Sequence, residues 1–289
     1  MMLLRATTRA AARSFSAAAA ATYTVPQAAI ESFRTKGWAV LPGFLSEAEI
    51  RPIEVNYDKF MRGEVPMHEK DFMDMSQSFA AIKGKHPDDW QIVNAMLPRK
   101  YMPAMANNIY ERRAAHAVAQ LFPGVKMALD YDQLLNKRPG KAGAVFAWHQ
   151  DMAYWPKTPD TRTTTFSLAV DATTALNGAL KFWSGSGVQR KLHEHKPIGK
   201  SRDDAHAVAV QVDETDPRIE MAEVKRGDVT IHDEWVVHGS GGNLSKGTRR
   251  TYVVAFRTQA TVDLERKAGF THSHADTVNW DTFPKEGLS

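Results

Sequence analysis

After residue 124 the chain changes from widely spaced apolar positions to short segments in which apolar and polar residues alternate. Eight such segments are separated by Gly, Pro and Asn, and they cover residues 126–135, 144–149, 163–171, 179–183, 207–212, 228–231, 236–239 and 250–257. Alternation with a period of two is typical of a strand with one buried face. The pattern therefore predicts a mainly β fold with flanking helices, built as a double-stranded β-helix, that is, a cupin-like jelly roll.

The preceding residues, 23–124, are expected to form a helical region that supports this β-roll. Ser46-Glu47-Ala48-Glu49 has the form of a capping box, and the apolar spacing after it predicts a helix that ends near Gly63. The positions expected to face inward are Ile50, Ile53, Val55 and Phe60. A second helix is predicted from about residue 105 to residue 121, where Pro123-Gly124 would stop it.

Residues 1–22 differ in composition from the rest of the chain, because they are rich in Ala, Ser and Thr and contain no acid. They carry three arginines spaced four apart: Arg5, Arg9 and Arg13. This composition is typical of an organelle presequence, and we expect delivery to the mitochondrial matrix, with a plastid or the cytosol as alternatives. Residues 23–289 are expected to form one domain, with a jelly-roll core at 125–258 and a C-terminal tail at 259–289.

The formal net charge of +4 does not indicate a nucleic-acid partner, because the presequence arginines account for most of it. No apolar run reaches the roughly 18 residues that a membrane span needs, so no span is predicted. Cysteine is absent, which excludes disulfides and thiolate metal ligands. A metal site in this chain would therefore use imidazole and carboxylate groups.

One group of residues has the composition of such a site. His149-Gln150-Asp151 closes an apolar run, and His238 lies in a later segment, next to Gly239. Residues i and i+2 of a strand project to the same face, so His149 and Asp151 could bind one ion while Gln150 points away. Two imidazoles and one carboxylate form the facial triad of non-haem Fe(II) oxygenases. The pattern therefore predicts an iron site formed by His149, Asp151 and His238.

Three other His-x-acid pairs are weaker candidates: His86-Pro87-Asp88, His232-Asp233-Glu234 and His274-Ala275-Asp276. The first lies in a stretch rich in Lys and Pro, where a turn is expected. The last is followed by no further histidine. His238 follows His232 by only six positions, which we take as too few for a separate strand to supply a third ligand. The set around His149 is therefore preferred.

Four stretches and one arginine resemble the phytanoyl-CoA dioxygenase family of 2-oxoglutarate oxygenases. They are residues 148–156, 177–180, 227–229 and 238–243, together with Arg249. The resemblance covers about residues 125–258 and includes the order and spacing of these stretches. In one departure, Trp183-Ser184-Gly185-Ser186-Gly187 replaces the Pro-Gly-Ser-His that the family commonly has after its Asn-Gly element. The rim of the site, and with it the substrate, is expected to differ.

The resemblance implies that the triad binds Fe(II), with 2-oxoglutarate and O2 as co-substrates. Arg249 would bind the distal carboxylate of 2-oxoglutarate, a role that suits the planar fork of a guanidinium group. Arg250, the next residue along a strand, would point to the opposite face. The resemblance also implies that Ser240 donates its hydroxyl to the same carboxylate and that Gln133 lies against the co-substrate.

The resemblance further implies that 2-oxoglutarate is decarboxylated to succinate and CO2 while a substrate C–H bond is hydroxylated. Family members that halogenate have a small residue at the carboxylate position of the triad, so Asp151 favours hydroxylation. Tyr154, Trp155 and Trp183 are either core aromatics or walls of the substrate pocket. The expected substrate is a small organic molecule, with anionic and acyl types among the candidates.

Two other classes of protein fit the sequence. One is a cupin-type metalloenzyme that does not use 2-oxoglutarate, and such an enzyme would not need a buried cation at Arg249. The other is a catalytically silent jelly-roll binding protein. The complete triad argues against the latter, because a decayed site usually loses at least one ligand.

Overall fold

The computed structural model describes residues 21–77, 79–197, 208–279, 282–283 and 287–288. The expected presequence, residues 1–22, lies almost entirely outside the described residues. No helix of the described ranges is long and apolar enough to cross a membrane.

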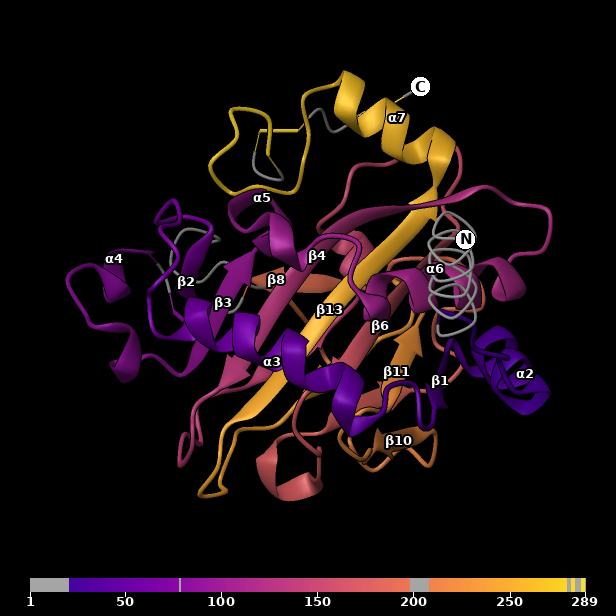
Figure 1. The fold of residues 1–289 in the computed structure, drawn as a ribbon. Coiled ribbons are helices and arrows are strands. Elements are labelled where there is room, and N and C mark those ends of the chain that lie inside the picture. The colour runs from indigo at the N-terminus through magenta and orange to yellow at the C-terminus, as the bar shows by residue number, and fades with distance from the viewer. Residues whose placement is uncertain (1–20, 78, 198–207, 280–281, 284–286, 289) are drawn as a thin grey trace, which may run out of the picture.

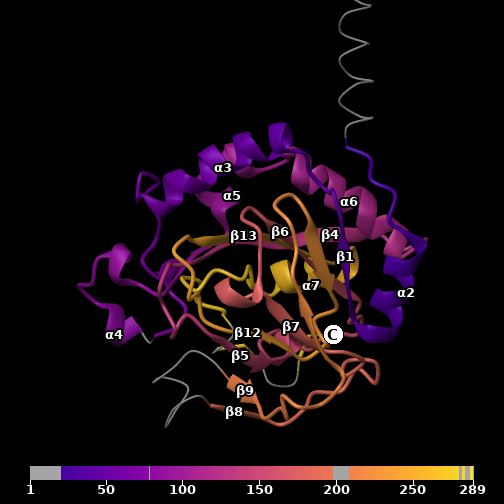
Figure 2. The ribbon, with the colours of Figure 1, turned by 90° about the horizontal axis from the view of Figure 1, so that it is seen from below.

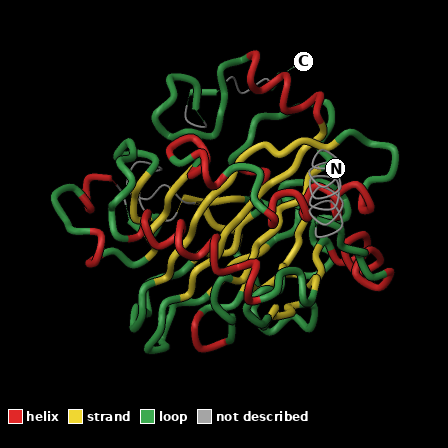
Figure 3. The backbone as a smooth tube through the Cα atoms, viewed as in Figure 1, coloured by secondary structure: helices red, strands yellow, loops and turns green. Residues whose placement is uncertain are grey.

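Two antiparallel sheets face each other and form the predicted jelly roll (Figures 1 and 3). The major sheet has the order β1 (Trp38–Leu41), β11 (Val229–His232), β6 (Thr163–Ala169), β13 (Arg249–Thr258), β4 (Met127–Lys137), β3 (Ile92–Met96) and β2 (Phe72–Asp74). The minor sheet has the order β10 (Ile219–Ala222), β7 (Leu180–Trp183), β12 (His238–Ser240) and β5 (Phe146–His149). A short ribbon pairs β8 (His195–Pro197) with β9 (Val208–Val210).

Helices flank this β-roll. The α-helices are α2 (Gln27–Lys36), α3 (Glu47–Met61), α4 (Phe79–Ile82), α5 (Pro98–Tyr101), α6 (Ile109–Leu121) and α7 (Gln259–Lys267). The 3-10 turns are η1 (Pro87–Asp89), η2 (Pro103–Met105), η3 (Asp151–Ala153) and η4 (Ala175–Asn177). Figure 2 shows α3 and α6 on the side of the major sheet that faces away from β5 and β12. The mainly β architecture with flanking helices is therefore confirmed.

The capping box predicted at Ser46 opens α3. The backbone N–H of Ser46 donates to Glu49 Oε2 over 2.8 Å, and the helix begins at the next residue. One predicted inward position is wrong, because 58% of Val55 is exposed. Ile50, Ile53 and Phe60 lie on the buried face at helical spacing, and Val55 falls on the opposite side.

The two faces of β13 have different roles. Tyr252 and Val254 point outward and join the main apolar core beneath α3 and α6. Thr251 and Val253 alternate with them and line the space between the sheets. A bulge between Ala255 and Phe256 interrupts the pairing with β4. The outer face of the sheet therefore builds the core, and the inner face is free to build a site.

Residues 23–124 contain more than the expected helices, because β1, β2 and β3 complete the major sheet. β1 pairs with β11, and β3 pairs with both β4 and β2. All five residues of β3 are buried, so this strand lacks the alternation of a half-exposed one. Fully buried or very short strands are therefore missed by the pattern.

The C-terminal residues 259–279 are attached to the β-roll by a buried ionic network. The Arg257 guanidinium lies 2.8 Å from Asp130 and 2.6 Å from Glu234. His272 Nε2 lies 2.7 Å from the same Asp130 carboxylate. These contacts hold the segment after α7 against the open end of the β-roll, where it becomes part of the cavity wall.

Candidate active site

A cavity of about 380 Å³ lies between the two sheets. Its walls come from the inner faces of β4, β13 and β6, from β5 and β7 of the minor sheet, from residues around β2, and from the segment after α7. All three predicted iron ligands line this cavity, and so does Arg249. Most of the wall is apolar.

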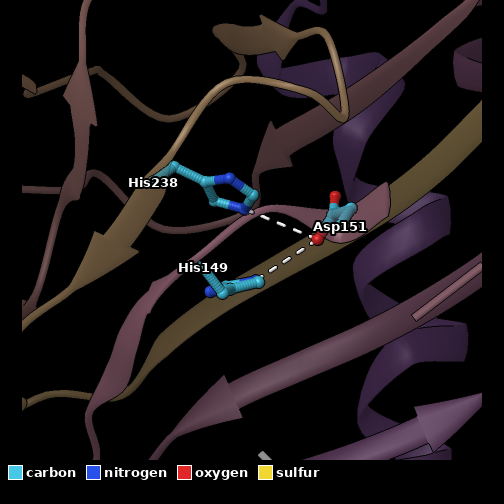
Figure 4. Close-up of side chains that lie close together, drawn as sticks. All are labelled: His149, Asp151 and His238. Atoms are coloured by element: carbon cyan, nitrogen blue, oxygen red, sulfur yellow. Dashed lines mark ion pairs between the residues drawn. The ribbon is translucent and has the colours of Figure 1, made fainter. Parts of the chain in front are cut away.

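The structure brings His149, Asp151 and His238 together (Figure 4). His149 on β5 and His238 on β12 are direct partners in the minor sheet, and their rings lie 4.4 Å apart between centroids. Asp151 Oδ1 lies 3.2 Å from His149 Nε2 and 3.7 Å from His238 Nε2. Gly239 allows this pairing, because a Cβ there would lie 2.9 Å from the backbone oxygen of Phe146.

Asp151 lies on a different element from the one expected. Strand β5 ends at His149, and Asp151 is the first residue of the 3-10 turn η3. The strand alternation expected for this pair is therefore wrong. Gln150 does point away, since its side-chain amide donates to the carbonyls of Lys191 and Trp235.

Backbone carbonyls fix both imidazole rings in the same way. His149 Nδ1 lies 2.7 Å from the carbonyl of Ala147, and His238 Nδ1 lies 3.1 Å from that of Val236. A carbonyl can only accept, so each Nδ1 carries a hydrogen and each ring points its Nε2 toward Asp151. This arrangement is the usual one for histidine ligands of a metal.

The charges of the three groups also suit a divalent cation. Burial and the neighbouring His149 ring lower the pKa of His238 to about 3, so this imidazole is neutral. Burial would raise the pKa of Asp151, but the facing imidazoles, His238 first among them, hold it well below its ordinary value. The site thus offers an ionised carboxylate beside a neutral imidazole, both ready to bind a metal.

A third histidine, His232, belongs to the site although it was rejected as a ligand. Its Nε2 lies 3.2 Å from Asp151 Oδ2, the carboxylate oxygen that faces away from His149. Its ring lies 4.4 Å from the His238 ring between centroids. His232 therefore orients the carboxylate by a hydrogen bond to its outer oxygen.

We expect His232→Ala to weaken Fe(II) binding about 10- to 100-fold, the usual effect of losing a hydrogen bond to a metal ligand. His232→Asn, which keeps a side-chain N–H donor, should recover part of the loss. Competition with a chromophoric chelator measures the affinity, with the exposed His68→Ala as control. Unchanged Fe(II) affinity in His232→Ala would show that the hydrogen bond to Asp151 has no such role.

Arg249 and Arg250 lie on opposite faces of β13. Arg250 points outward, where its guanidinium is paired with Asp171 and Asp58, each at 2.8 Å. Arg249 points into the cavity and is 4% exposed. Among the described residues its guanidinium has no hydrogen-bond or ion-pair partner, and burial lowers its pKa to about 10. An unpaired buried guanidinium is a binding site for an anion.

Ser240 and Gln133, the two other residues predicted to contact the co-substrate, have different hydrogen-bond partners. Ser240 follows His238 by two residues on β12, so its side chain also points inward, and its Oγ lies 2.6 Å from Lys137 Nζ. Gln133 on β4 lines the cavity, and its amide donates to Asn94 Oδ1 over 2.7 Å. Lys137 was not considered as a site residue from the sequence.

The three aromatic candidates divide into two groups. Tyr154 and Trp155 line the cavity beside the triad. Trp183 does not, because the inward positions of β7 are Leu180 and Phe182, and Trp183 alternates to the outer face. The indole N–H of Trp183 donates to an aspartate outside the site. The assignment of Trp183 to the substrate pocket is therefore wrong.

The residues present fit both groups that the sequence predicts. Two imidazoles and one carboxylate on one side of an ion leave the remaining coordination positions open toward the cavity. The unpaired Arg249 guanidinium in the same cavity suits a carboxylate of a co-substrate. A second His/acid cluster, Asp130, Glu265 and His272, is occupied by the Arg257 guanidinium and does not form such a site.

Comparison with curated proteins identifies relatives of part of the chain. A 140-residue stretch is 30% identical to the probable alpha-ketoglutarate-dependent hypophosphite dioxygenase of Stutzerimonas stutzeri, and it covers 47% of this chain and 46% of that protein. The peroxisomal phytanoyl-CoA dioxygenase of Mus musculus is 21% identical over 235 residues, which are 75% of this chain and 64% of that protein. The chain thus spans less than two thirds of either relative.

Solved structures share the fold. EvdO2 from Micromonospora carbonacea var. aurantiaca, complexed with 2-oxoglutarate, matches with a TM-score of 0.64 and 23% identity, covering 82% of this chain and 92% of that one. The epimerase SnoN, in complex with Fe3+, alpha ketoglutarate and nogalamycin RO, matches with a TM-score of 0.58 and 18% identity, covering 80% and 83%. The family model described as Phytanoyl-CoA dioxygenase (PhyH) matches residues 33–251. Since this match extends over well more than half of the sequence, the chain belongs to the phytanoyl-CoA dioxygenase family.

Proposed function

We propose that this chain is an Fe(II)- and 2-oxoglutarate-dependent dioxygenase that hydroxylates a C–H bond of a small, largely apolar substrate. The observation that carries the proposal is the unpaired Arg249 guanidinium in the same cavity as the triad. A cupin-type enzyme that does not use 2-oxoglutarate would have no need for a buried cation there. A silent binding protein would need neither the cation nor the complete triad.

The arrangement of charges gives 2-oxoglutarate one orientation in the cavity. The planar fork of Arg249 would bind the distal carboxylate, and the other end of the molecule, with its 2-oxo and carboxylate oxygens, would reach the triad. Iron, when bound, would supply the open coordination positions for the co-substrates and the oxidising power for C–H cleavage. Both curated relatives carry dioxygenase names, which supports this class of reaction.

The protein's own side chains would hold the reactants and exclude water. Backbone carbonyls fix the two imidazole rings, and His232 fixes the carboxylate of Asp151. Tyr154 and Trp155 cover the cavity beside the triad. A dry, closed cavity protects a strongly oxidising site from side reactions with solvent.

The walls of the cavity indicate the class of substrate. Apart from the groups around the triad, they are mainly thioether, aromatic and aliphatic, with Met73, Met75, Met96, Leu135, Val145, Trp155, Leu180 and Phe270 among them. Arg249 is the one lysine or arginine that lines the cavity in the described part of the chain. Once it binds the co-substrate, no such cation remains for an anionic substrate. This observation favours an uncharged reacting group over the anionic candidates, hypophosphite-like anions included.

The proposal can be tested with the purified protein and 2-oxoglutarate labelled at C1. We expect release of labelled CO2 that requires Fe(II) and O2 and that stops when iron is removed by a chelator, since uncoupled decarboxylation does not need the substrate. An inactive, metal-bound protein that also fails to bind 2-oxoglutarate would favour the cupin-type alternative.

A further inference from the structure

Lys137 is a buried lysine beside the proposed co-substrate site, and it does not line the cavity itself. It ends strand β4, and its side chain is fully buried. Its Nζ donates to Ser240 Oγ over 2.6 Å and to the carbonyl of Gly241. Among the described residues no carboxylate lies within ion-pair distance of it. Burying an ammonium group without an anion is costly, which calls for an explanation.

The position of Lys137 places it next to Arg249. The two residues are direct partners in the ladder between β4 and β13, so their side chains leave the sheet on the same face. Burial, and next the charge of Arg249, lower the pKa of Lys137 to about 6. Asp171, a carboxylate whose charge acts on Arg249, is already bound by Arg250. Lys137 and Arg249 thus lie side by side without an anion of their own, and a pKa of about 6 leaves Lys137 largely neutral at pH 7 until an anion binds nearby.

Ser240 connects Lys137 to the end of the cavity where Arg249 lies. Ser240 lies opposite Phe146 on β5 and Leu180 on β7, and both of these residues line the cavity. When the Lys137 ammonium donates to Ser240 Oγ, a lone pair of the hydroxyl is used, and its hydrogen must point elsewhere. The remaining acceptor at this end would be the carboxylate that Arg249 binds.

We propose that Lys137 is a positioning residue for the co-substrate: it fixes the Ser240 hydroxyl so that its hydrogen points at the distal carboxylate of 2-oxoglutarate. Lys137 acts on the carboxylate through Ser240, whose hydroxyl it holds by the hydrogen bond from Nζ to Oγ. The inference rests on the proposed binding of 2-oxoglutarate at Arg249.

The test compares Lys137→Met, Ser240→Ala and the double variant. Isothermal titration of the anaerobic Fe(II) protein with 2-oxoglutarate gives Kd for each. We expect each single substitution to raise Kd about 10-fold, the effect of losing one charge-assisted hydrogen bond. Because Lys137 acts through Ser240, the double variant should stay near 10- to 20-fold rather than reach about 100-fold. Lys126→Met, exposed just before the same strand, is the matched control.

Two further measurements separate positioning from a structural role. Methionine replaces a buried amine that has no anionic partner and fills similar space, so Tm of Lys137→Met should not fall. Its Fe(II) affinity, and its kcat at saturating 2-oxoglutarate, should match those of the wild type. A lowered Tm with unchanged Kd would mean that Lys137 only stabilises the contact between β4 and the loop at Gly241. A 100-fold increase of Kd in the double variant would mean that Lys137 and Ser240 act on 2-oxoglutarate independently of each other. Either result overturns the inference, whereas a wild-type protein that does not bind 2-oxoglutarate refutes the proposed function itself.

Discussion

Asp151→Ala is expected to abolish Fe(II)-dependent decarboxylation of 2-oxoglutarate while the fold is retained. Asp151 is the one anion among the three groups that converge on the cavity, and its carboxylate balances part of the charge of a divalent ion. Loss of a hydrogen bond to a metal ligand already costs about 10- to 100-fold, so loss of the ligand itself should cost at least about 1,000-fold. The rate of labelled CO2 release measures the effect.

The control for this variant is Asp263→Ala, which removes an exposed carboxylate from α7. It should decarboxylate 2-oxoglutarate at the wild-type rate. Circular dichroism and Tm establish that Asp151→Ala is folded, and removal of a buried charge among imidazoles should leave the β-roll intact. Wild-type turnover by a folded Asp151→Ala protein would show that this carboxylate does not bind the catalytic metal.

The β-roll was predictable because most of its strands have one buried and one cavity-facing side. Every one of the eight alternating segments overlaps a strand of the structure, and β13 shows why: Tyr252 and Val254 face the core while Thr251 and Val253 face the cavity. β3 also has a core side, with Val93 and Ala95, and a cavity side, with Met96, but all five of its residues are buried and four of them are apolar. A period of two appears in the sequence only when the two sides differ in polarity, and in β3 both sides are mainly apolar.

The histidines show a second limit of prediction from the sequence. The sequence interpretation excludes His232 because a distance of six positions to His238 is short for two separate strands. The structure spans this distance by crossing between sheets: His232 ends β11 in the major sheet and His238 begins β12 in the minor sheet. The two sheets face each other, so a short crossing brings both rings into one site. Spacing along the chain could not reveal this, because it contains no information on which sheet a strand joins.

Burial of charge was the least predictable feature. Lys137 ends a strand and is followed by Arg138, so in the sequence it resembles an ordinary exposed lysine. The contacts of Arg257 with Asp130 and Glu234 join strands far apart in the chain, and no local pattern marks them. The burial of Arg249 was predictable, unlike that of Lys137 and Arg257, because the family resemblance implies that Arg249 binds a carboxylate inside the β-roll. Charged side chains are buried where partners from distant segments meet them, which only the fold determines.

Arg249→Lys is expected to raise the Kd and KM for 2-oxoglutarate about 10- to 100-fold while Fe(II) affinity stays unchanged. An ammonium cannot reproduce the two parallel hydrogen bonds of a guanidinium fork, and each charge-assisted bond contributes about 1.5–3 kcal/mol. The titration and steady-state kinetics in 2-oxoglutarate measure the change. Equal losses for 2-oxoglutarate and Fe(II) would point to a disturbed fold rather than to a lost carboxylate contact.

The adjacent Arg250→Lys provides the matched control, because it makes the same chemical change on the opposite face of β13. Arg250 binds Asp171, Asp58 and Glu54 outside the cavity. Its replacement should therefore lower Tm slightly and leave the Kd and KM for 2-oxoglutarate unchanged. A larger 2-oxoglutarate effect in Arg250→Lys than in Arg249→Lys would contradict the assigned orientation of the strand. The pair therefore tests whether the alternation of β13, and not merely the presence of two arginines, determines where the co-substrate binds.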